Sequence, residues 1–495
     1  MTSKVAINRL ATGVPGLDEV LGGGLPEFSF NLIAGQPGSG KTTLAHQIMF
    51  ALATPERLAI YFTVLGEPPL KMLRYQQQFE FFDSEAINRS LRFVNLSEDA
   101  MVGDLDRALK RIVDEVTQHS PAFVFVDSFR SVMLASEASG SPHKGLQQFV
   151  QQLGMLMTSW QATTFLIGEY FNQNDDNPVF TVCDGLIWLR QSVHRNSMVR
   201  KMEVLKMRGQ ATLPGLHSFR IGDQGLMVFP PASLAPRQAS GAVLLTPRLK
   251  MGEAGLDGML GGGLPRGYSL LIAGPSGSGK SIMAAAFLAE GARCGETGVI
   301  AAFEQHPNRS RNRIVADLIA SGVVGLVENR VADLSIDEVM FLLLREICRL
   351  GASRVVIDSL SGLELVLAPT FREDFRELLS TLVTTLAGLG VTVLMTSELE
   401  DRFTDLRFSP YGTAFMTDAI IVQRYIEVDS RLRRVMAVVK VRASAHSDEL
   451  REFSIDADGI HIGDALADQE GLLGGKPTRK LAAQPLVNEV GGKDA

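Results

Sequence analysis

Short runs of consecutive apolar residues, each followed by a longer helix-like segment, recur along the whole chain. Parallel strands covered by helices on both faces have such continuous apolar runs, whereas strands with one wetted face alternate apolar and polar residues. This pattern predicts an α/β fold with mainly parallel sheets. The predicted strands are 29–35, 58–64, 122–128, 163–169 and 185–190 in the first half, and 268–274, 297–303, 353–359, 391–397 and 419–425 in the second.

The second half of the sequence repeats the first in the same order. GLDEVLGGGLP at 16–26 returns as GLDGMLGGGLP at 255–265, an offset of 239 residues. GQPGSGKTT beginning at Gly35 returns as GPSGSGKSI beginning at Gly274 with the same offset. A repeat of this length is a complete domain with its own core and not one unit of a solenoid.

The repeat divides the chain into two domains, which we place at 1–235 and 236–466. The segment 230–241 is rich in Pro, Ala and Ser, a composition typical of linkers. Residues 467–495 lose apolar periodicity and contain many glycines and charges, so we predict a flexible C-terminal tail.

Each half contains the spacing G-x4-G-K-[ST] between an apolar strand and a helix-forming run. In this P-loop pattern the glycines let successive backbone N–H groups turn toward phosphate oxygens at the positive end of a helix. The lysine contacts the β and γ phosphates. We predict two ATP sites, formed by Gly35, Gln36, Pro37, Gly38, Ser39, Gly40, Lys41, Thr42 and Thr43, and by Gly274, Pro275, Ser276, Gly277, Ser278, Gly279, Lys280 and Ser281.

An aspartate ends an apolar strand downstream of each P-loop, Asp127 in the first half and Asp358 in the second. A carboxylate at the carboxyl end of a parallel strand can reach the Mg²⁺ that accompanies a bound nucleotide. The hydroxyl after the P-loop lysine is a second oxygen ligand. We therefore predict Mg²⁺ sites at Thr42 with Asp127 and at Ser281 with Asp358.

The halves differ after their second strand, where an acid can orient or deprotonate the attacking water. Glu304 directly follows this strand in the second half, whereas Leu65 stands at the equivalent position in the first and Glu67 comes two residues later. Two extended residues displace a carboxylate by about 6 Å. We predict catalytic roles for Glu304 and Glu67 and different turnover rates in the two halves.

Composition narrows the functional classes. The 495 residues are 45% apolar and 21% charged, as in a soluble globular protein. A net charge of −7 opposes wholesale attraction to a nucleic-acid backbone. Because the sequence has no signal-peptide core, no long apolar run and only three widely spaced cysteines, we expect a cytoplasmic protein that does not insert into a membrane.

These motifs resemble the KaiC family of RecA-superfamily ATPases over roughly residues 8–465. The resemblance rests on the GLDxxLGGGLP leader, the duplication, and a KxRG-type run at Lys206 that returns as KVRA at Lys440. It implies two tandem RecA-like P-loop NTPase domains, each with a mainly parallel twisted sheet flanked by helices. It also implies a homo-hexameric ring with ATP between protomers, and a regulatory protein partner, since the founding member is a circadian clock protein.

In such a ring, the resemblance implies that Lys206 and Arg208 reach the γ phosphate of the neighbouring protomer. Lys440 and Arg442 would do the same in the second half. A cation supplied from outside the pocket stabilises charge that develops in the transition state, so hydrolysis would depend on assembly. A basic strand edge facing solvent is the alternative interpretation.

The family also phosphorylates its own adjacent Ser and Thr, which precede a Thr-Asp pair at the start of a strand in the second domain. Here the two positions are Ala414 and Phe415, which have no hydroxyl. The resemblance implies serine/threonine kinase chemistry in which Glu304 activates the acceptor. Thr413 and Thr417 are the nearby hydroxyls.

Three functions are compatible with the sequence. The leading one is a double-domain ATPase ring whose nucleotide state controls partner binding, in signalling or timing. The second is a RecA- or helicase-like motor on DNA, which needs basic loops that track a strand and is opposed by the net charge. The third is a scaffold locked by nucleotide, whose first domain turns over little ATP because Leu65 replaces the acid.

Overall fold

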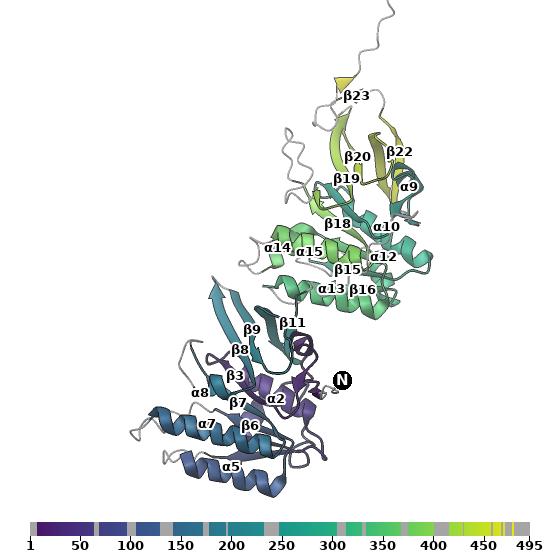
Figure 1. The fold of residues 1–495 in the computed structure, drawn as a ribbon. Helices are drawn as coiled ribbons and strands as arrows, with labels where there is room; N and C mark the ends of the chain where they lie inside the picture. The colour runs from purple at the N-terminus through teal and green to yellow at the C-terminus, as the bar shows by residue number, and fades with distance from the viewer. Residues whose placement is uncertain are drawn as a thin grey trace, which may run out of the picture. The chain divides into compact units, whose positions relative to one another are not determined.

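The computed structural model describes the chain in two compact units, Met1–Pro231 and Ala232–Ala495 (Figure 1). The described residues are 7–63, 69–96, 105–128, 142–171, 178–194, 197–231, 247–303, 313–328, 333–367, 375–399, 415–428, 430–456, 459–466, 469–470 and 478–479. The predicted linker lies mostly outside these ranges.

The first unit is built on a nine-stranded sheet with the strand order β11-β10-β9-β8-β3-β7-β6-β4-β5. Strands β5, β4, β6, β7, β3 and β8 run parallel, and β8 to β11 form an antiparallel extension. The strands are β3 (Phe30–Gly35), β4 (Ala59–Thr63), β5 (Leu91–Asn95), β6 (Phe123–Asp127), β7 (Thr163–Glu169), β8 (Gly185–His194), β9 (Ser197–Met207), β10 (His217–Gly222) and β11 (Gly225–Phe229).

The second unit repeats this topology in the order β16-β15-β17-β18-β14-β19-β20-β21-β22. Its strands are β14 (Ser269–Gly274), β15 (Gly298–Ala302), β16 (Val324–Glu328), β17 (Arg354–Asp358), β18 (Thr392–Glu398), β19 (Ala419–Val428), β20 (Arg431–Val441), β21 (Arg451–Asp456) and β22 (Gly459–Ala465). The equivalent strand orders show that the sequence repeat is a repeat of the whole fold.

Helices cover both faces of each sheet (Figure 1). In the first unit, α5 (Leu105–His119) and α7 (Pro142–Ser159) pack on one face and α2 (Lys41–Leu52) on the other. In the second unit, α13 (Ile336–Leu350), α14 (Leu360–Val366) and α15 (Phe375–Gly388) pack opposite α10 (Lys280–Arg293) and α12 (Arg313–Ala320). Apolar residues of alternate strand positions meet the two helical layers, so each sheet lies between two cores.

Smaller elements complete the two units. The short helices are α1 (Leu17–Val20), α3 (Pro69–Gln76), α8 (Pro178–Val182) and α9 (Ala254–Met259). The two-residue strands are β1 (Arg9–Leu10), β2 (Leu25–Pro26), β12 (Arg248–Leu249), β13 (Leu264–Pro265), β23 (Gln469–Glu470) and β24 (Thr478–Arg479). Strands β23 and β24 pair within the segment predicted as a tail. Among the described residues, no helix has the length and apolar character needed to span a bilayer.

The predicted fold class is confirmed: both units are RecA-like, with mainly parallel sheets flanked by helices. All six residues of β3 are buried, as its continuous apolar run predicts. The edge strand β5 was not predicted from the sequence because its burial is interrupted by exposed residues.

The glycine-rich leader before the first P-loop forms a structural link within its unit. Asp18 accepts hydrogen bonds from the Thr12 N–H (2.9 Å) and hydroxyl (2.7 Å). Gly22, Gly23 and Gly24 have φ of 78°, 116° and 109°, in the left-handed region that favours glycine. Gln210, two residues after Arg208, donates to the carbonyls of Leu21 (2.6 Å) and Gly24 (2.7 Å). The leader thus ties the start of the unit to the loop that follows the KMRG run.

His46 makes the stability of the first unit dependent on pH. Its ring is fully buried in α2, 4.6 Å from the Tyr61 ring between centroids. Burial lowers the pKa of His46 from 6.5 to about 4, and the nearby Gln76 side chain opposes that shift. The unfolded chain therefore takes up a proton that the folded chain excludes between these two values, and the first unit loses stability as the pH falls through this window.

We expect the wild-type chain to lose about 2 kcal/mol more free energy of unfolding between about pH 7 and about pH 5 than the variant His46→Leu. Urea unfolding of both proteins at the two pH values measures the difference. Equal losses in the two proteins would contradict the assignment of the effect to His46.

Candidate functional site

The first P-loop curls between β3 and α2. Gly40 precedes the helix with φ of 100°, and a Cβ at this position would lie 2.6 Å from the Ile221 Cδ1 atom. The left-handed backbone conformation favours glycine there, and a Cβ would also force the end of the Ile221 side chain to move. Lys41 Nζ donates to the Gln36 carbonyl (2.8 Å), so the lysine side chain folds back over the loop.

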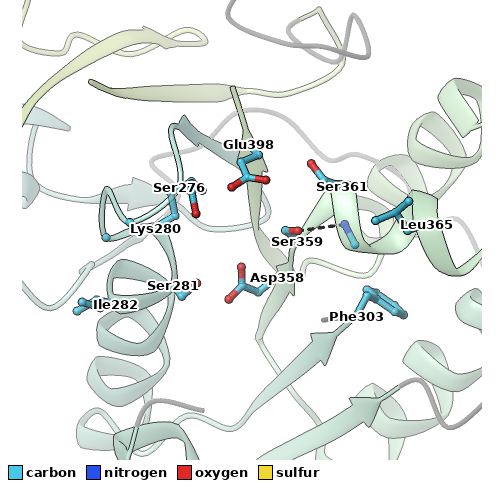
Figure 2. A pocket seen from close by; sticks show the side chains of 13 residues that line it. Ser276, Lys280, Ser281, Ile282, Phe303, Asp358, Ser359, Ser361, Leu365 and Glu398 are labelled. Carbon is cyan, nitrogen blue, oxygen red and sulfur yellow. Dashed lines mark hydrogen bonds between the residues drawn. The ribbon is translucent and has the colours of Figure 1, made fainter. Parts of the chain in front are cut away.

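The second P-loop repeats these contacts between β14 and α10. Lys280 Nζ donates to the carbonyls of Gly274 (2.8 Å) and Pro275 (2.8 Å). Gly279 precedes α10 with φ of 104°. The loop borders a cavity of about 450 Å³, into which Ser276, Lys280, Asp358 and Glu398 face in Figure 2.

The predicted nucleotide-binding residues divide into a cavity wall and a supporting layer. A cavity of about 340 Å³ in the first unit is lined by Gly38, Gly40, Lys41, Thr42 and Thr43 of the P-loop, and the second cavity by Ser276, Gly277, Gly279, Lys280 and Ser281. Ser39 and Ser278 are buried instead, and the Ser278 hydroxyl donates to Gln423 Oε1 (2.8 Å). The Pro37 carbonyl accepts a hydrogen bond from Gln191 (3.1 Å). The supporting layer fixes the shape of the loop.

The predicted metal-binding pairs lie together in both units. Thr42 Oγ1 donates to Asp127 Oδ2 at 2.8 Å. Ser281 and Asp358 line one cavity in the second unit (Figure 2). Burial raises the pKa of Asp127, while hydrogen bonds from Tyr61 and Thr42 and the charge of Lys41 oppose the rise.

A hydroxyl with a carboxylate suits Mg²⁺, which takes few protein ligands and completes its octahedron with phosphate oxygens and water. No cluster of three or more His, Cys, Asp or Glu side chains that could hold an ion by themselves occurs in the described parts of the chain. The hydroxyl and carboxylate oxygens therefore suit a metal ion whose remaining ligands come from a bound phosphate group and water.

Glu169 and Glu398 are cavity residues that the sequence analysis missed. Glu169 ends β7 and pairs in register with Gly35, and Glu398 ends β18 and pairs with Gly274. Both line the cavities opposite the P-loops. Burial lowers the pKa of Lys41 and of Lys280, and the charges of Glu169 and Glu398 oppose this effect. The recurrence of Glu at one strand position in both halves was the available sequence signal.

The cations of the KMRG run lie at the opposite end of the sheet from the first P-loop. Lys206 donates to the Thr181 carbonyl (3.0 Å), and Arg208 pairs with the Asp184 carboxylate (3.0 Å). Asp184 directly precedes β8, whose residue Leu189 pairs with Gly35 at the start of the P-loop. Five residues of strand separate the two ends by about 16 Å. Arg208 therefore does not reach the P-loop of its own unit.

The second unit places its cations in the same way. Lys440 Nζ donates to the Thr417 carbonyl (2.6 Å), and Arg442 contacts the Asp418 carboxylate (3.1 Å) and the Phe415 carbonyl (3.0 Å). Burial lowers the pKa of Lys440, with a further contribution from the nearby Arg442. Arg442 is exposed, so its guanidinium is accessible from outside the unit.

Several predicted residues fall outside the described ranges. These are Glu67, Glu304, Ala414 and Thr413, together with Leu65. Phe303, directly before Glu304, lines the second cavity. Phe415 is 63% exposed and Thr417 is fully buried.

Two RecA-like folds, each with a P-loop, a hydroxyl and a strand-end aspartate around one cavity, define a tandem P-loop NTPase. The model of the ATPase family described as KaiC matches residues 10–233 and 249–467, so the chain belongs to the KaiC family.

Curated relatives span nearly the full length of the chain. The circadian clock oscillator protein KaiC of Rippkaea orientalis is 26% identical over 96% of this chain and 92% of its own length. The circadian clock protein KaiC3 of Synechocystis is 27% identical, with 98% and 97% covered. The circadian clock oscillator protein KaiC of Prochlorococcus marinus is 25% identical, with 97% of each chain covered.

Proposed function

We propose that each half of this chain binds Mg²⁺-ATP and hydrolyses it, and that the nucleotide state controls the binding of a regulatory protein partner. The observation that carries the proposal is the convergence of a P-loop lysine, a hydroxyl and a strand-end aspartate on one cavity, twice in the same chain. We take residues 1–235 and 236–466 as the two ATPase domains and 467–495 as a tail.

Each group has a distinct task in this chemistry. The P-loop N–H groups and the ammonium of Lys41 or Lys280 bind the phosphates and neutralise their charge. Thr42 with Asp127, and Ser281 with Asp358, hold Mg²⁺, which when bound polarises the phosphate oxygens. Glu304 and Glu67 orient the attacking water and accept its proton. In the sequence, Glu304 comes two positions after the last residue of β15, whereas Glu67 comes four positions after the last residue of β4, so we assign the faster turnover to the second half.

The two exposed arginines, Arg208 and Arg442, and the half-buried lysines beside them support hydrolysis between protomers of a homo-hexamer. Arg208 lies about 16 Å along the strands from its own P-loop, and Lys206 donates to the Thr181 carbonyl near the same end, so we assign both cations to the γ phosphate of a neighbouring protomer. A head-to-tail interface that closes on itself places this end of one protomer beside the P-loop of the next. Lys440 and Arg442 have the same role in the second half.

The biological role proposed is timing or signalling, because the relatives named above are circadian clock proteins. Autophosphorylation at the family's usual positions is not part of the proposal, since Ala414 and Phe415 carry no hydroxyl. With Thr417 fully buried, its hydroxyl is not presented to a nucleotide on another protomer.

Steady-state ATP hydrolysis by the full chain tests the proposal. We expect Mg²⁺-dependent turnover that single-stranded DNA does not stimulate. We further expect Glu304→Gln to lower the hydrolysis rate of the second half about 100-fold, because general-base catalysis contributes about 10²–10⁴-fold to a rate. Glu67→Gln should lower the total rate less than Glu304→Gln does. Turnover that requires DNA would favour a motor. ATP binding without turnover would favour a nucleotide-locked scaffold, and equal losses in the two variants would overturn the ranking of the two halves.

A further inference from the structure

Each strand-end aspartate accepts a hydrogen bond from a buried hydroxyl on a neighbouring strand, and the two halves use different strands. In the first half, the Tyr61 hydroxyl on β4 donates to Asp127 Oδ2 at 2.7 Å, the same oxygen that Thr42 contacts. In the second half, the Thr396 hydroxyl on β18 donates to Asp358 Oδ1. The aspartates are thus held from opposite sides.

The strand register shows that the two halves exchange a hydroxyl residue and an isoleucine between two equivalent positions. Ile300 on β15 is the equivalent of Tyr61 on β4. Each stands two residues before the residue that pairs with the strand-end aspartate. Ile167 occupies the position on β7 that Thr396 occupies on β18. Each half therefore combines one hydroxyl residue with one isoleucine, in opposite order, around an otherwise equivalent carboxylate.

Packing alone does not account for the hydroxyls. The Tyr61 ring lies 4.6 Å from the His46 ring and 5.9 Å from the Phe125 ring, contacts that phenylalanine would also make. Tyr61 and Thr396 are both fully buried, and a buried hydroxyl is costly without a hydrogen-bond partner. In both halves, the aspartate supplies the acceptor.

We propose that Tyr61 and Thr396 are positioning residues that orient Asp127 and Asp358 toward the Mg²⁺-nucleotide, one in each half. The inference rests on the proposed function. The Thr42 hydroxyl could bind a metal through a lone pair of its oxygen while its hydrogen still bonds Asp127 Oδ2, and the Tyr61 hydroxyl holds that same oxygen from β4. Fixing one carboxylate oxygen in this way directs the other toward the cavity. Partners of this kind orient metal ligands and change metal affinity when they are removed.

The test uses the full chain with one half silenced. Lys280→Ala leaves the first nucleotide site for study, and Lys41→Ala leaves the second. In each background, the binding of a fluorescent ATP analogue is titrated with Mg²⁺, and is measured separately in EDTA. Direct binding of Mn²⁺, followed by electron paramagnetic resonance with a non-hydrolysable ATP analogue, gives a second measurement that does not depend on turnover.

We expect Tyr61→Phe to raise the half-saturating Mg²⁺ concentration of the first half about tenfold. Thr396→Val should do the same in the second half, and neither variant should change nucleotide affinity in EDTA. The matched control Thr164→Val removes a buried hydroxyl from β7 that donates to the Ala162 carbonyl, and should leave the Mg²⁺ response unchanged. Tyr61→Met also removes the hydroxyl and should give the same shift as Tyr61→Phe.

The outcomes separate this inference from the proposed function. If the silenced parents bind ATP with a normal Mg²⁺ response and the hydroxyl variants leave that response unchanged, the inference is wrong and the proposed function stands. A shift of equal size in EDTA and in Mg²⁺ would indicate general damage to the site and would also overturn it. If the parents show no Mg²⁺-dependent ATP binding, the proposed function fails and the inference fails with it.

Discussion

The double variant Lys41→Ala, Lys280→Ala is expected to bind ATP about 100-fold more weakly at both sites, while each single variant is weakened at one of its two sites. Each ammonium lies at the mouth of its P-loop, held by backbone carbonyls at 2.8 Å. On a nucleotide it would exchange these contacts for charged phosphate oxygens. A charge-assisted hydrogen bond contributes up to about 3 kcal/mol, so the affinity of a site should fall roughly 100-fold.

Isothermal titration calorimetry of the full chain with Mg²⁺-ATP measures this effect as a change in stoichiometry. At ATP concentrations that just saturate the wild type, the wild type should bind two nucleotides per chain, each single variant one, and the double variant none. Lys110→Ala removes the same charge from an exposed position of α5 and serves as the control. Two bound nucleotides in the double variant would mean that the P-loops are not the binding sites.

Arg354→Ala is expected to lower the free energy of unfolding more than the substitutions of His46 and Arg57 do. Arg354 begins β17 with a side chain only 2% exposed. Its guanidinium pairs with Glu296 (2.7 Å), donates to the Phe287 carbonyl (2.8 Å) and lies 4.6 Å from the centre of the Phe287 ring. Alanine removes these bonds and leaves the half-buried Glu296 with Arg266 as its remaining partner (3.0 Å), and breaking a buried pair costs about 3 kcal/mol.

The first half offers a matched control for this variant. Phe123 occupies the position of Arg354, and Arg57 contacts its ring from outside, 4.8 Å from the centre. Because Arg57 is 40% exposed, we expect Arg57→Ala to cost less than about 1 kcal/mol. Thermal unfolding of the two variants beside the wild type measures both effects. Similar losses from Arg354→Ala and Arg57→Ala would refute the argument from burial.

Local sequence patterns predicted those parts of the fold that depend on local chemistry. The run FNLIAG of β3 is apolar except for Asn31, and this composition reflects the burial of both faces of the strand under helices. Strand β5 lies at the edge of the sheet, where exposed residues interrupt the run. Arg354 would be expected in water by its residue type, and its burial depends on acceptors supplied from α10 and elsewhere.

In the candidate site too, features that depend on local sequence were predicted, and features that depend on contacts between distant segments were not. The P-loops and the strand-end aspartates were predicted because fixed spacing carries their chemistry, and the structure brings Thr42 and Asp127 to 2.8 Å. The contact between Tyr61 and Asp127 was not predicted, since it depends on the register of two strands that lie far apart in the sequence. Glu169 was missed for a related reason: its position beside the P-loop follows from the pairing of β7 with β3.

The separation of Arg208 from Lys41 along the strands gives the first unit two unlike ends, one that contains the P-loop cavity and one that carries an exposed arginine. In the proposed ring, substitution of Arg208 would inactivate the pocket of the neighbouring protomer, while the mutated protomer kept its own pocket intact. Rings mixed from subunits that lack Arg208 and subunits that lack Lys41 would therefore contain some complete sites. Such a site forms where the pocket of a subunit that keeps Lys41 lies against a neighbour that keeps Arg208. Two inactive proteins would restore activity to each other in one assembly.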